Sequence, residues 1–333
     1  MTEPVLCRRI NAGIKWRFNV KKYVAFSVVL IVCLSVFGCK KNDIGTIDTS
    51  KKIEELRRST KKRLKEKKEK ARPEIEFIRV TKAYEYDSAP AFSPDGTKIA
   101  YVSYQDDTQN IWIIDSEGNE EPKRITNTAT LDNRPTWSAD GKSIIFSSAK
   151  LNDNVEPKLC IVNSDGTNLR QLGEEVHGYN PSCSPVNGQI VFVSQNNLWI
   201  MKTLNDKPEY ITIKGYYDYP CWMDNAKKVL FSSDNDLHSM NIDKKESICL
   251  TNTAWNSFPS ASLKTNKIAF ISNRNGNYDL WIMNSDGTNP VQITNDKYNE
   301  LYPCFSSDGS KIVFQSDKSG NFDIWVAKLP ENM

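Results

Sequence analysis

The chain has 333 residues, of which 39% are hydrophobic and 26% are charged, a composition that excludes a protein with many membrane spans. Its net charge of +3 hides an asymmetry, because residues 1–74 carry 20 basic and 8 acidic side chains whereas residues 75–333 carry 24 and 33. A basic leader thus precedes an acidic body, and we expect no nucleic-acid partner. Only two histidines, His177 and His238, are present, which argues against a metal or catalytic centre built on several histidines.

The N-terminal region has the features of a targeting segment. Two lysines precede an apolar run over residues 23–38, and its 16 residues are fewer than the roughly 20 that a spanning helix needs. The run ends in the letters VFGC, which resemble the lipobox of bacterial lipoproteins. The resemblance implies a signal peptide over residues 1–38 and acylation of Cys39; the alternative is an uncleaved single-span anchor. A translation start at Val20 in place of Met1 would give a more typical signal peptide.

Residues 39–75 are predicted to form a lipid-anchored, basic helical linker. Residues 51–71 are rich in Lys, Glu and Arg and have almost no apolar face, which is typical of a solvated helix, and Pro73 would end it. The alternative is a basic stalk attracted to anionic lipid headgroups. Together with the leader, this linker predicts a protein attached to the bacterial cell envelope, on its periplasmic or extracellular face.

Six similar segments fill the rest of the chain, and they share a proline at one position, a turn and an apolar run. The six prolines are Pro90, Pro135, Pro181, Pro220, Pro259 and Pro303. Each segment predicts two strands joined by a tight turn, often Asp-Gly, because that pair supplies the left-handed residue that a hairpin needs. A third strand carries a large residue at one position, tryptophan in four repeats, and a fourth short strand usually ends in Ile/Leu-Thr.

The last repeat ends without a fourth strand, and a matching strand is found at the start of the body. Residues 77–81 have the fourth-strand pattern and precede Pro90 by nearly the same distance as the other fourth strands precede their prolines. We therefore expect this segment to complete the last blade and close the ring. The predicted fold is all-β: a six-bladed propeller over residues 76–333, with four antiparallel strands in each blade, preceded by a helical stalk.

The repeats resemble those of the TolB-type propeller, a distant relative of the WD repeat. The resemblance is carried by SPDGTKIAYVS at 93–103, GNYDLWIMNSDGTNPVQIT at 276–294 and SSDGSKIVFQSDKSGNFDIWVAK at 306–328. It implies the fold, whereas its implications for function are broad, because such propellers serve as periplasmic adaptors, as gating domains of peptidases and in polysaccharide lyases. TolB itself carries an α/β domain before its propeller, and a charged spacer stands in that place here.

Few patterns in the body indicate catalysis. No Gly-x-Ser-x-Gly nucleophile elbow is present, which argues against a peptidase of the prolyl oligopeptidase kind. His238 replaces a third-strand tryptophan and is expected to pack between blades, and His177 is expected in a solvated loop. We expect no cofactor and no metal; calcium is the alternative to ordinary turn chemistry in the Asp- and Asn-rich turns at residues 234–236, 273–279 and 317–323.

The body has an odd number of cysteines, so at least one of the five is expected to be a free thiol if all disulfides are internal. Cys183 and Cys221 belong to the first strands of neighbouring repeats, which makes a disulfide between them one arrangement. We favour the other, in which these cysteines and Cys160, Cys249 and Cys304 are small, buried, unpaired side chains.

The loops from each fourth strand to the next first strand concentrate aromatic residues, and in a propeller such loops surround one mouth of the channel. Tyrosine and tryptophan mixed with a few polar groups are typical of a recognition surface. The predicted ligand-binding rim consists of Tyr86, Asp87, Asp132, Arg134, Tyr179, Tyr217, Asp218, Tyr219, Trp255, Asn256, Phe258 and Tyr302.

The predicted function is that of a cell-envelope lipoprotein whose monomeric propeller binds an envelope protein or peptide without catalysis. The alternative is a polysaccharide-binding protein, lyase or hydrolase, in which the rim aromatics stack on sugars and carboxylates from Asp132, Asp218 or Glu300 act as acids across the rim. A structural scaffold without a dedicated ligand is the third interpretation.

Overall fold

The computed structural model describes residues 54, 57–61, 75–105, 108–151, 155–173, 176–212 and 215–331. The chain divides into two units, Met1–Arg72 and Pro73–Met333, and the strands that the structure describes belong to the second. In the first unit, Glu54 and residues 57–61 are helical and exposed. The predicted signal peptide and Cys39 lie outside the described residues. Within the described part of the chain, no helix combines the length and the apolar character needed to cross a membrane.

The first complete repeat shows how the sequence builds each sheet. Strands β2 (Tyr86–Phe92), β3 (Lys98–Gln105), β4 (Thr108–Asp115) and β5 (Lys123–Arg124) pair antiparallel in chain order. Side chains close the turn after β2, where Ser93 Oγ donates to Asp95 at 2.6 Å and Gly96 has a left-handed φ of 71°. The same Ser-x-Asp-Gly turn recurs after two later first strands, with φ of 68° at Gly141 and 71° at Gly309.

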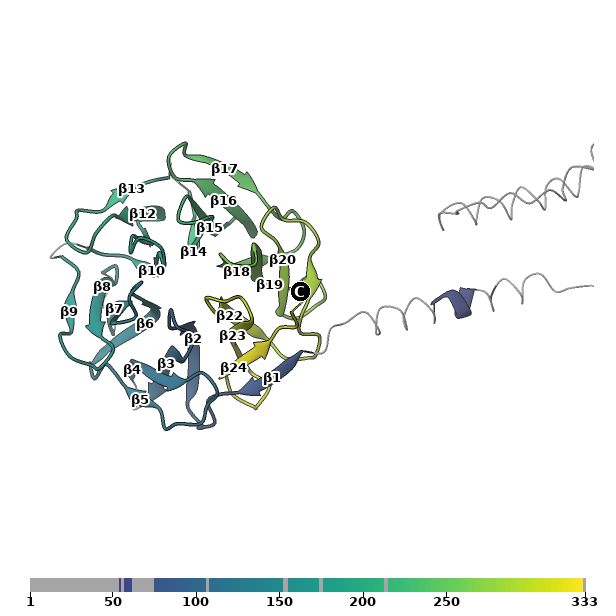
Figure 1. Ribbon diagram of the computed structural model, residues 1–333, viewed down its shortest axis with the longest axis horizontal. Coiled ribbons are helices and arrows are strands. Elements are labelled where there is room, and N and C mark those ends of the chain that lie inside the picture. The colour runs from purple at the N-terminus through teal and green to yellow at the C-terminus, as the bar shows by residue number, and fades with distance from the viewer. Residues whose placement is uncertain are drawn as a thin grey trace, which may run out of the picture. The chain divides into compact units, whose positions relative to one another are not determined.

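The later repeats follow the same order. Their strands are β6 (Thr130–Trp137), β7 (Ser143–Lys150), β8 (Lys158–Asn163), β9 (Arg170–Gln171), β10 (Tyr179–Cys183), β11 (Ile190–Ser194), β12 (Asn197–Met201), β13 (Glu209–Tyr210), β14 (Asp218–Met223), β15 (Lys228–Ser233), β16 (Asp236–Asn241), β17 (Glu246–Cys249), β18 (Asn256–Ser262), β19 (Lys267–Ser272), β20 (Asp279–Asn284), β21 (Val291–Gln292), β22 (Glu300–Phe305), β23 (Lys311–Ser316) and β24 (Asp323–Lys328), with β1 (Glu76–Arg79) ahead of them all. The sheets stand side by side in a ring (Figure 1). The fold is an all-β propeller with almost no helix, as predicted.

The strands form four separate four-stranded sheets and one eight-stranded sheet. The prediction of six separate blades is therefore wrong for the first two repeats, which share the larger sheet. The cause is the length of β6, whose eight residues exceed those of every other first strand. This extension lets Leu131 pair in parallel with Gln109 of β4, and that single pair joins β2–β5 to β6–β9.

The ring closes where β1 pairs antiparallel with β24, as predicted. The pairing runs over four residues, from Glu76 opposite Lys328 to Arg79 opposite Trp325. Just beyond β1, the backbone N–H of Val80 donates to the carbonyl oxygen of Ile324 at 2.8 Å. The first and last parts of this unit therefore form one sheet, although they are far apart in the sequence.

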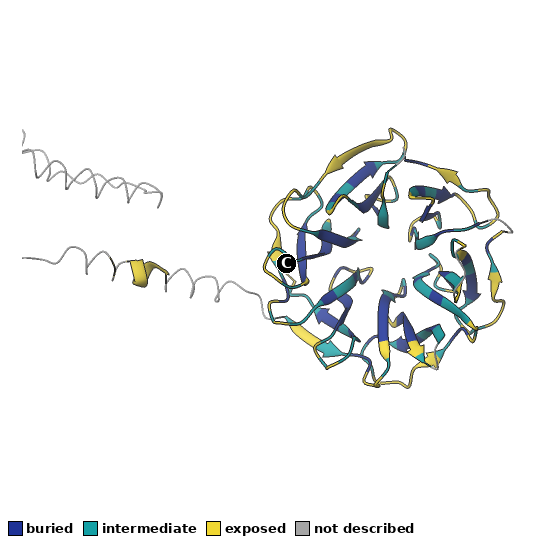
Figure 2. Ribbon diagram, turned by 180° about the vertical axis from the view of Figure 1, so that it is seen from behind, coloured by how far each residue is buried: buried dark blue, intermediate teal, exposed yellow. Residues whose placement is uncertain are grey.

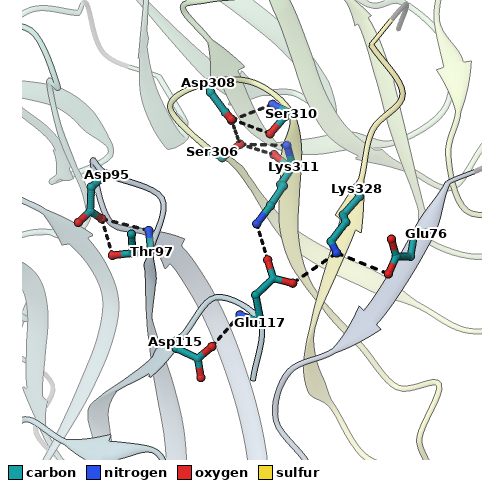
Figure 3. A network of polar contacts seen from close by, with 10 residues as sticks. All are labelled: Glu76, Asp95, Thr97, Asp115, Glu117, Ser306, Asp308, Ser310, Lys311 and Lys328. Carbon is teal, nitrogen blue, oxygen red and sulfur yellow. Dashed lines mark hydrogen bonds and ion pairs between the residues drawn. The ribbon is translucent and has the colours of Figure 1, made fainter. Parts of the chain in front are cut away.

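Ion pairs reinforce this closure on both sides of the strand. Figure 3 shows the carboxylate of Glu117 between two ammonium groups, 2.5 Å from Lys311 Nζ and 3.4 Å from Lys328 Nζ. Lys328 also lies 3.5 Å from Glu76 on β1. At the other end of β1, Arg79 pairs at 2.9 Å with the fully buried carboxylate of Asp323. These contacts tie the β1–β24 pair to the first repeat as well as to the last.

The hydrophobic core lies between neighbouring sheets, and the second strand of each repeat contributes one aromatic ring to it. These rings, all at most 2% exposed, are Tyr101, Phe146, Phe192, Phe231, Phe270 and Phe314. Each lies opposite the large third-strand position, as Phe270 lies opposite Trp281. At this position His238 stacks on Phe231, with ring centroids 5.6 Å apart. Figure 2 shows buried residues on the inner strands and exposed ones on the outermost strands.

We expect a chain that lacks residues 1–81 to melt at least about 10 °C below a chain that lacks only residues 1–74. The longer deletion removes β1 and Val80, whose burial contributes about 1.5–3 kcal/mol, together with backbone hydrogen bonds of about 1 kcal/mol each. Each kcal/mol shifts the melting temperature of a domain of this size by about 2–4 °C.

Differential scanning fluorimetry of the two chains checks this expectation. Size-exclusion chromatography provides a second measurement, because the bare edge of β24 should promote association. Equal melting temperatures would contradict the role of β1 as the closing strand.

Candidate functional site

A narrow cavity of about 110 Å³ lies where the first strands approach one another around the ring axis. We call this cavity the throat. It is lined by six residue pairs that each end in a repeat proline: Ala89–Pro90, Arg134–Pro135, Asn180–Pro181, Tyr219–Pro220, Phe258–Pro259 and Tyr302–Pro303. The prolines that define the repeat in the sequence therefore surround a single space in the structure.

The residue before each of these prolines has a left-handed backbone and lies in a β-bulge. All six have φ between 49° and 56°, and the strand register shifts at each of these positions. Such a backbone costs a non-glycine residue about 1–3 kcal/mol, so the surrounding structure must impose it. Ala89 and Asn180 have this left-handed backbone, and so do the four larger residues. The bulge is therefore a property of the repeat and does not depend on the side chain. The side chains that stand there are what give the throat its chemistry.

Arg134 stacks on the aromatic rings of the throat. Its guanidinium carbon lies 3.6 Å from the ring centroid of Tyr302, 4.7 Å from that of Tyr219 and 5.7 Å from that of Phe258. The three rings also touch one another, since Phe258 is 4.2 Å from Tyr219 and 4.4 Å from Tyr302 between centroids. A cation held over aromatic faces in this way is stabilised by about 0.5–2 kcal/mol.

A wider cavity of about 320 Å³, which we call the rim cavity, adjoins the throat at Tyr219. It lies over the starts of β14 and β18 and the loops beside them. Its aromatic lining residues are Tyr179, Tyr216, Tyr217, Tyr219 and Trp255. Trp255 is fixed edge-on between Phe258 and Tyr278, with centroids 5.7 and 5.1 Å away. The rim cavity thus offers rigid aromatic walls at the loop-rich mouth of the propeller.

Asp218 lines the rim cavity and directly precedes Tyr219, the residue that lines both cavities. Burial raises the pKa of Asp218, while the backbone N–H of Tyr219, at 2.9 Å, and the positive charge of Arg134 act in the opposite direction. The side-chain amide of Asn180 also donates to this carboxylate. Asp218 therefore holds the Asn180 and Tyr219 positions of the throat together.

The structure brings nine of the twelve predicted rim residues to these two cavities. Arg134, Tyr219, Phe258 and Tyr302 line the throat, and Tyr179, Tyr217, Asp218, Trp255 and Asn256 line the rim cavity. Tyr86 lies outside both cavities, 42% exposed and in edge contact with Phe322. The prediction omits Ala89 and Asn180, which complete the throat. Their place directly before a repeat proline is the signal that identifies them.

Asp87, Asp132 and Asn256 are almost fully buried, and this corrects their prediction as surface contacts. The Asp132 carboxylate accepts hydrogen bonds from Thr128 and Thr130, both at 2.9 Å, and from Ser148 at 2.6 Å. These bonds tie the loop ahead of β6 to β7. A buried polar residue at the start of a first strand thus stabilises the neighbouring rim loop through hydrogen bonds.

Glu300 is buried in the same way, with 1% exposure. The hydroxyl groups of Thr294 and Ser316 donate to its carboxylate at 2.5 and 3.0 Å. Burial nevertheless raises the pKa of Glu300 to about 8, and the nearby Asp296 and Asp279 add to the rise. Of the three carboxylates predicted as acids for the polysaccharide alternative, Asp132 and Glu300 are enclosed, and Asp218 lines a cavity.

All five cysteines of the body are free thiols, so the bridge between Cys183 and Cys221 is not formed. Cys249 is exposed on the outermost strand β17 and the other four are half-buried, so the prediction that all five are buried is wrong. Cys183, Cys221 and Cys304 line a separate cavity of about 260 Å³, built from the residues that follow the prolines. Burial raises the pKa of Cys183 to about 11 and that of Cys221 to about 12. Both thiols are therefore protonated at neutral pH and poor nucleophiles.

His177 is not a freely solvated side chain, because its Nδ1 atom lies 2.9 Å from the carbonyl oxygen of Glu156. Among the residues that the structure describes, no three His, Cys, Asp or Glu side chains come close enough to hold a metal ion together. The Asn-rich turn at residues 273–279 is tied to the loop ahead of β22, since Asn277 Nδ2 donates to the carbonyl oxygens of Asp296 at 3.0 Å and Tyr298 at 2.6 Å.

Comparison with known proteins supports a specific family. The family model described as the TolB beta propeller domain matches residues 75–247. The Tol-Pal system protein TolB of Francisella tularensis subsp. mediasiatica is 26% identical over 220 residues, which cover 62% of this chain and 50% of that protein. The chain spans half or less of the length of the curated relatives it matches.

Two solved structures share the fold. TolB from Acinetobacter baumannii superposes with a TM-score of 0.53 at 19% identity, covering 74% of this chain and 64% of that one. An oligogalacturonate lyase in complex with manganese superposes with a TM-score of 0.52 at 12% identity, covering 77% of this chain and 93% of the lyase. At these identities the likeness concerns the fold alone.

We expect the melting temperature to fall as the pH rises from about 5 to about 9, in part because of Glu300. Its folded-state pKa of about 8 lies above the ordinary value of 4.5, so the folded protein binds this proton more tightly than the unfolded chain. The resulting stabilisation is fully present below about pH 4.5 and is lost as the pH rises through about 8. Glu300→Gln, which retains an uncharged group of the same shape, should flatten the decline.

Thermal melting over this pH range checks the expectation. Asp165→Asn is the matched control, because Asp165 lies in an exposed turn where hydrogen bonds from Thr167 lower its pKa. The control should keep the slope of the parent chain. A slope that Glu300→Gln leaves unchanged would contradict the assignment.

Proposed function

Because the chain belongs to the TolB beta propeller domain family, we propose that its propeller is a non-catalytic scaffold that binds a protein or peptide segment of the bacterial cell envelope. The proposed contact surface consists of the throat and the rim cavity. The observation that carries the proposal is the set of aromatic side chains around the rim cavity, of which Tyr216 is 75% exposed. Rigid aromatic groups next to a few polar ones are typical of the energetic centre of a protein interface.

The dimensions favour a segment over a folded domain as the bound part. A cavity of about 320 Å³ accommodates a few side chains, and the adjoining throat of about 110 Å³ accommodates a smaller group. A segment that crosses the rim can therefore place its side chains in both cavities. Tyr219, which lines both, would contact it at the junction.

We also infer that the eight-stranded sheet acts as two blades, so that six repeats surround the throat. Six residue pairs before and at the repeat prolines line it, two of them from the larger sheet. Among the described residues of that sheet, the pair of Gln109 and Leu131 is the one strand pairing between the two groups of four strands. This supports a ring of six units, with one local connection between the first two.

The position on the envelope is a further part of the proposal. The leader supports removal of residues 1–38 and acylation of Cys39, with residues 39–75 as a linker and residues 76–333 as a monomeric propeller. Membership of a family that includes Tol-Pal system proteins is consistent with a periplasmic or extracellular placement.

We expect Tyr216→Ala and Trp255→Ala to reduce capture of one stoichiometric envelope protein by at least about tenfold, because aromatic anchors carry most of the energy of such contacts. The full chain serves as bait in detergent-solubilised envelope, and mass spectrometry identifies and quantifies what it retains. Tyr216→Ala should leave thermal melting unchanged, since this side chain is exposed.

Tyr210→Ala is the matched control, because Tyr210 is 62% exposed on the outermost strand β13, away from both cavities. Equal capture by the rim variants and the parent chain would refute the rim as the contact surface. Capture of no protein, together with retention of oligogalacturonate offered separately to the same bait, would favour the polysaccharide alternative.

A further inference from the structure

The throat contains one charged side chain. Of the twelve residues that line it, only Arg134 carries a charge, and the others are prolines, aromatic residues, Ala89 and Asn180. The guanidinium carbon lies 3.6 Å from the ring centroid of Tyr302, and the equivalent positions of the other repeats carry no charge. The positive charge is therefore concentrated at a single point of an otherwise uncharged passage.

No carboxylate balances this charge at close range. Among the described residues, no Asp or Glu oxygen lies within 4.0 Å of the Arg134 guanidinium. Asp218 and Arg134 influence each other through their charges, but the Asp218 carboxylate is already bound by Asn180 and by the backbone of Tyr219. Arg134 thus retains capacity for an anionic partner from outside the chain.

The stacking arrangement determines how such a partner can approach. The ring centroids of Tyr302 and Tyr219 lie 3.6 and 4.7 Å from the guanidinium carbon, and a side-chain hydrogen bond with Tyr219 uses part of the guanidinium edge. A guanidinium has five N–H donors, so others remain for a partner. A guanidinium edge matches a planar carboxylate, which accepts two parallel N–H···O bonds. The left-handed backbone at Arg134, with φ of 56°, fixes the point from which the side chain extends.

From these observations we infer that the throat receives a carboxylate of the bound peptide segment and that Arg134 binds it through its N–H edge. This inference rests on the proposed function and specifies the chemistry of its ligand. The carboxylate belongs either to the C-terminus of the partner or to an Asp or Glu side chain. A throat of about 110 Å³ has room for such a group, while neighbouring side chains of the segment occupy the rim cavity.

The test uses a library of synthetic hexapeptides, half with a free C-terminal carboxylate and half with a C-terminal carboxamide, panned on the immobilised full chain. Each enriched sequence is then resynthesised in two neutral versions. One version replaces the C-terminal carboxylate by a carboxamide, and the other replaces Asp and Glu side chains by Asn and Gln. We expect the neutral versions to bind at least about tenfold more weakly, since hydrogen bonds to charged groups are the stronger ones. The version that loses affinity identifies the source of the carboxylate.

Variants test the role of Arg134 in the same assay. Arg134→Gln should reduce affinity for the acidic peptides at least about tenfold and abolish the difference between acidic and neutral versions. Arg134→Lys should restore only part of the affinity, because an ammonium group lacks the planar fork. Arg170→Gln, which removes an exposed arginine on β9, is the control and should bind as the parent chain does.

The outcomes separate this inference from the proposed function. If peptides are enriched but bind equally well in acidic and neutral versions, the inference is overturned and the peptide-binding function stands. This comparison uses the parent chain and does not depend on the stability of the variants. If no peptide is enriched, both the inference and the proposed function fail.

Discussion

Every sheet in this molecule has two apolar faces, and neither face is stable in water until a neighbouring sheet covers it. A row of such sheets would leave its two ends bare, so the arrangement is stable only as a closed ring. The chain closes the ring by pairing β1 with β24, and Arg79 with Asp323 and Glu117 with two lysines reinforce that junction. The positions of the first strands, and with them the throat, depend on this closure.

Closure forces the first strands together around the axis, where there is little room for ordinary side-chain packing. In each repeat the first strand contains a β-bulge and a proline at this point, and the residue before the proline has a left-handed backbone. This backbone geometry occurs in all six repeats, and the repeats differ in the side chain at the position before the proline. The result is an asymmetric throat in which Tyr219, Phe258 and Tyr302 surround the guanidinium of Arg134.

Much of this fold is predictable from the sequence, because six prolines, the Asp-Gly turns and the apolar runs recur in a fixed order, and because residues 77–81 match the missing last strand. The joining of the first two repeats is not predictable, since it depends on one pair, Gln109 and Leu131, at the end of a long strand. Nine of the twelve residues predicted from loop composition line the two cavities. Loop composition did not reveal that Asp132 faces inward, where its carboxylate accepts hydrogen bonds from Thr128 and Thr130 nearby in the sequence and from Ser148 on the neighbouring strand β7.

The closing strand also has a mechanical consequence. Glu76 is the first residue of β1, so tension on the chain ahead of it acts first on the β1–β24 ladder. Tension along the strand loads the hydrogen bonds of the ladder together, whereas tension across it breaks them one after another, starting at the Glu76–Lys328 pair. The segment that joins the propeller to the rest of the chain is thus also the part whose detachment would open the ring, which makes β1 a force-bearing joint.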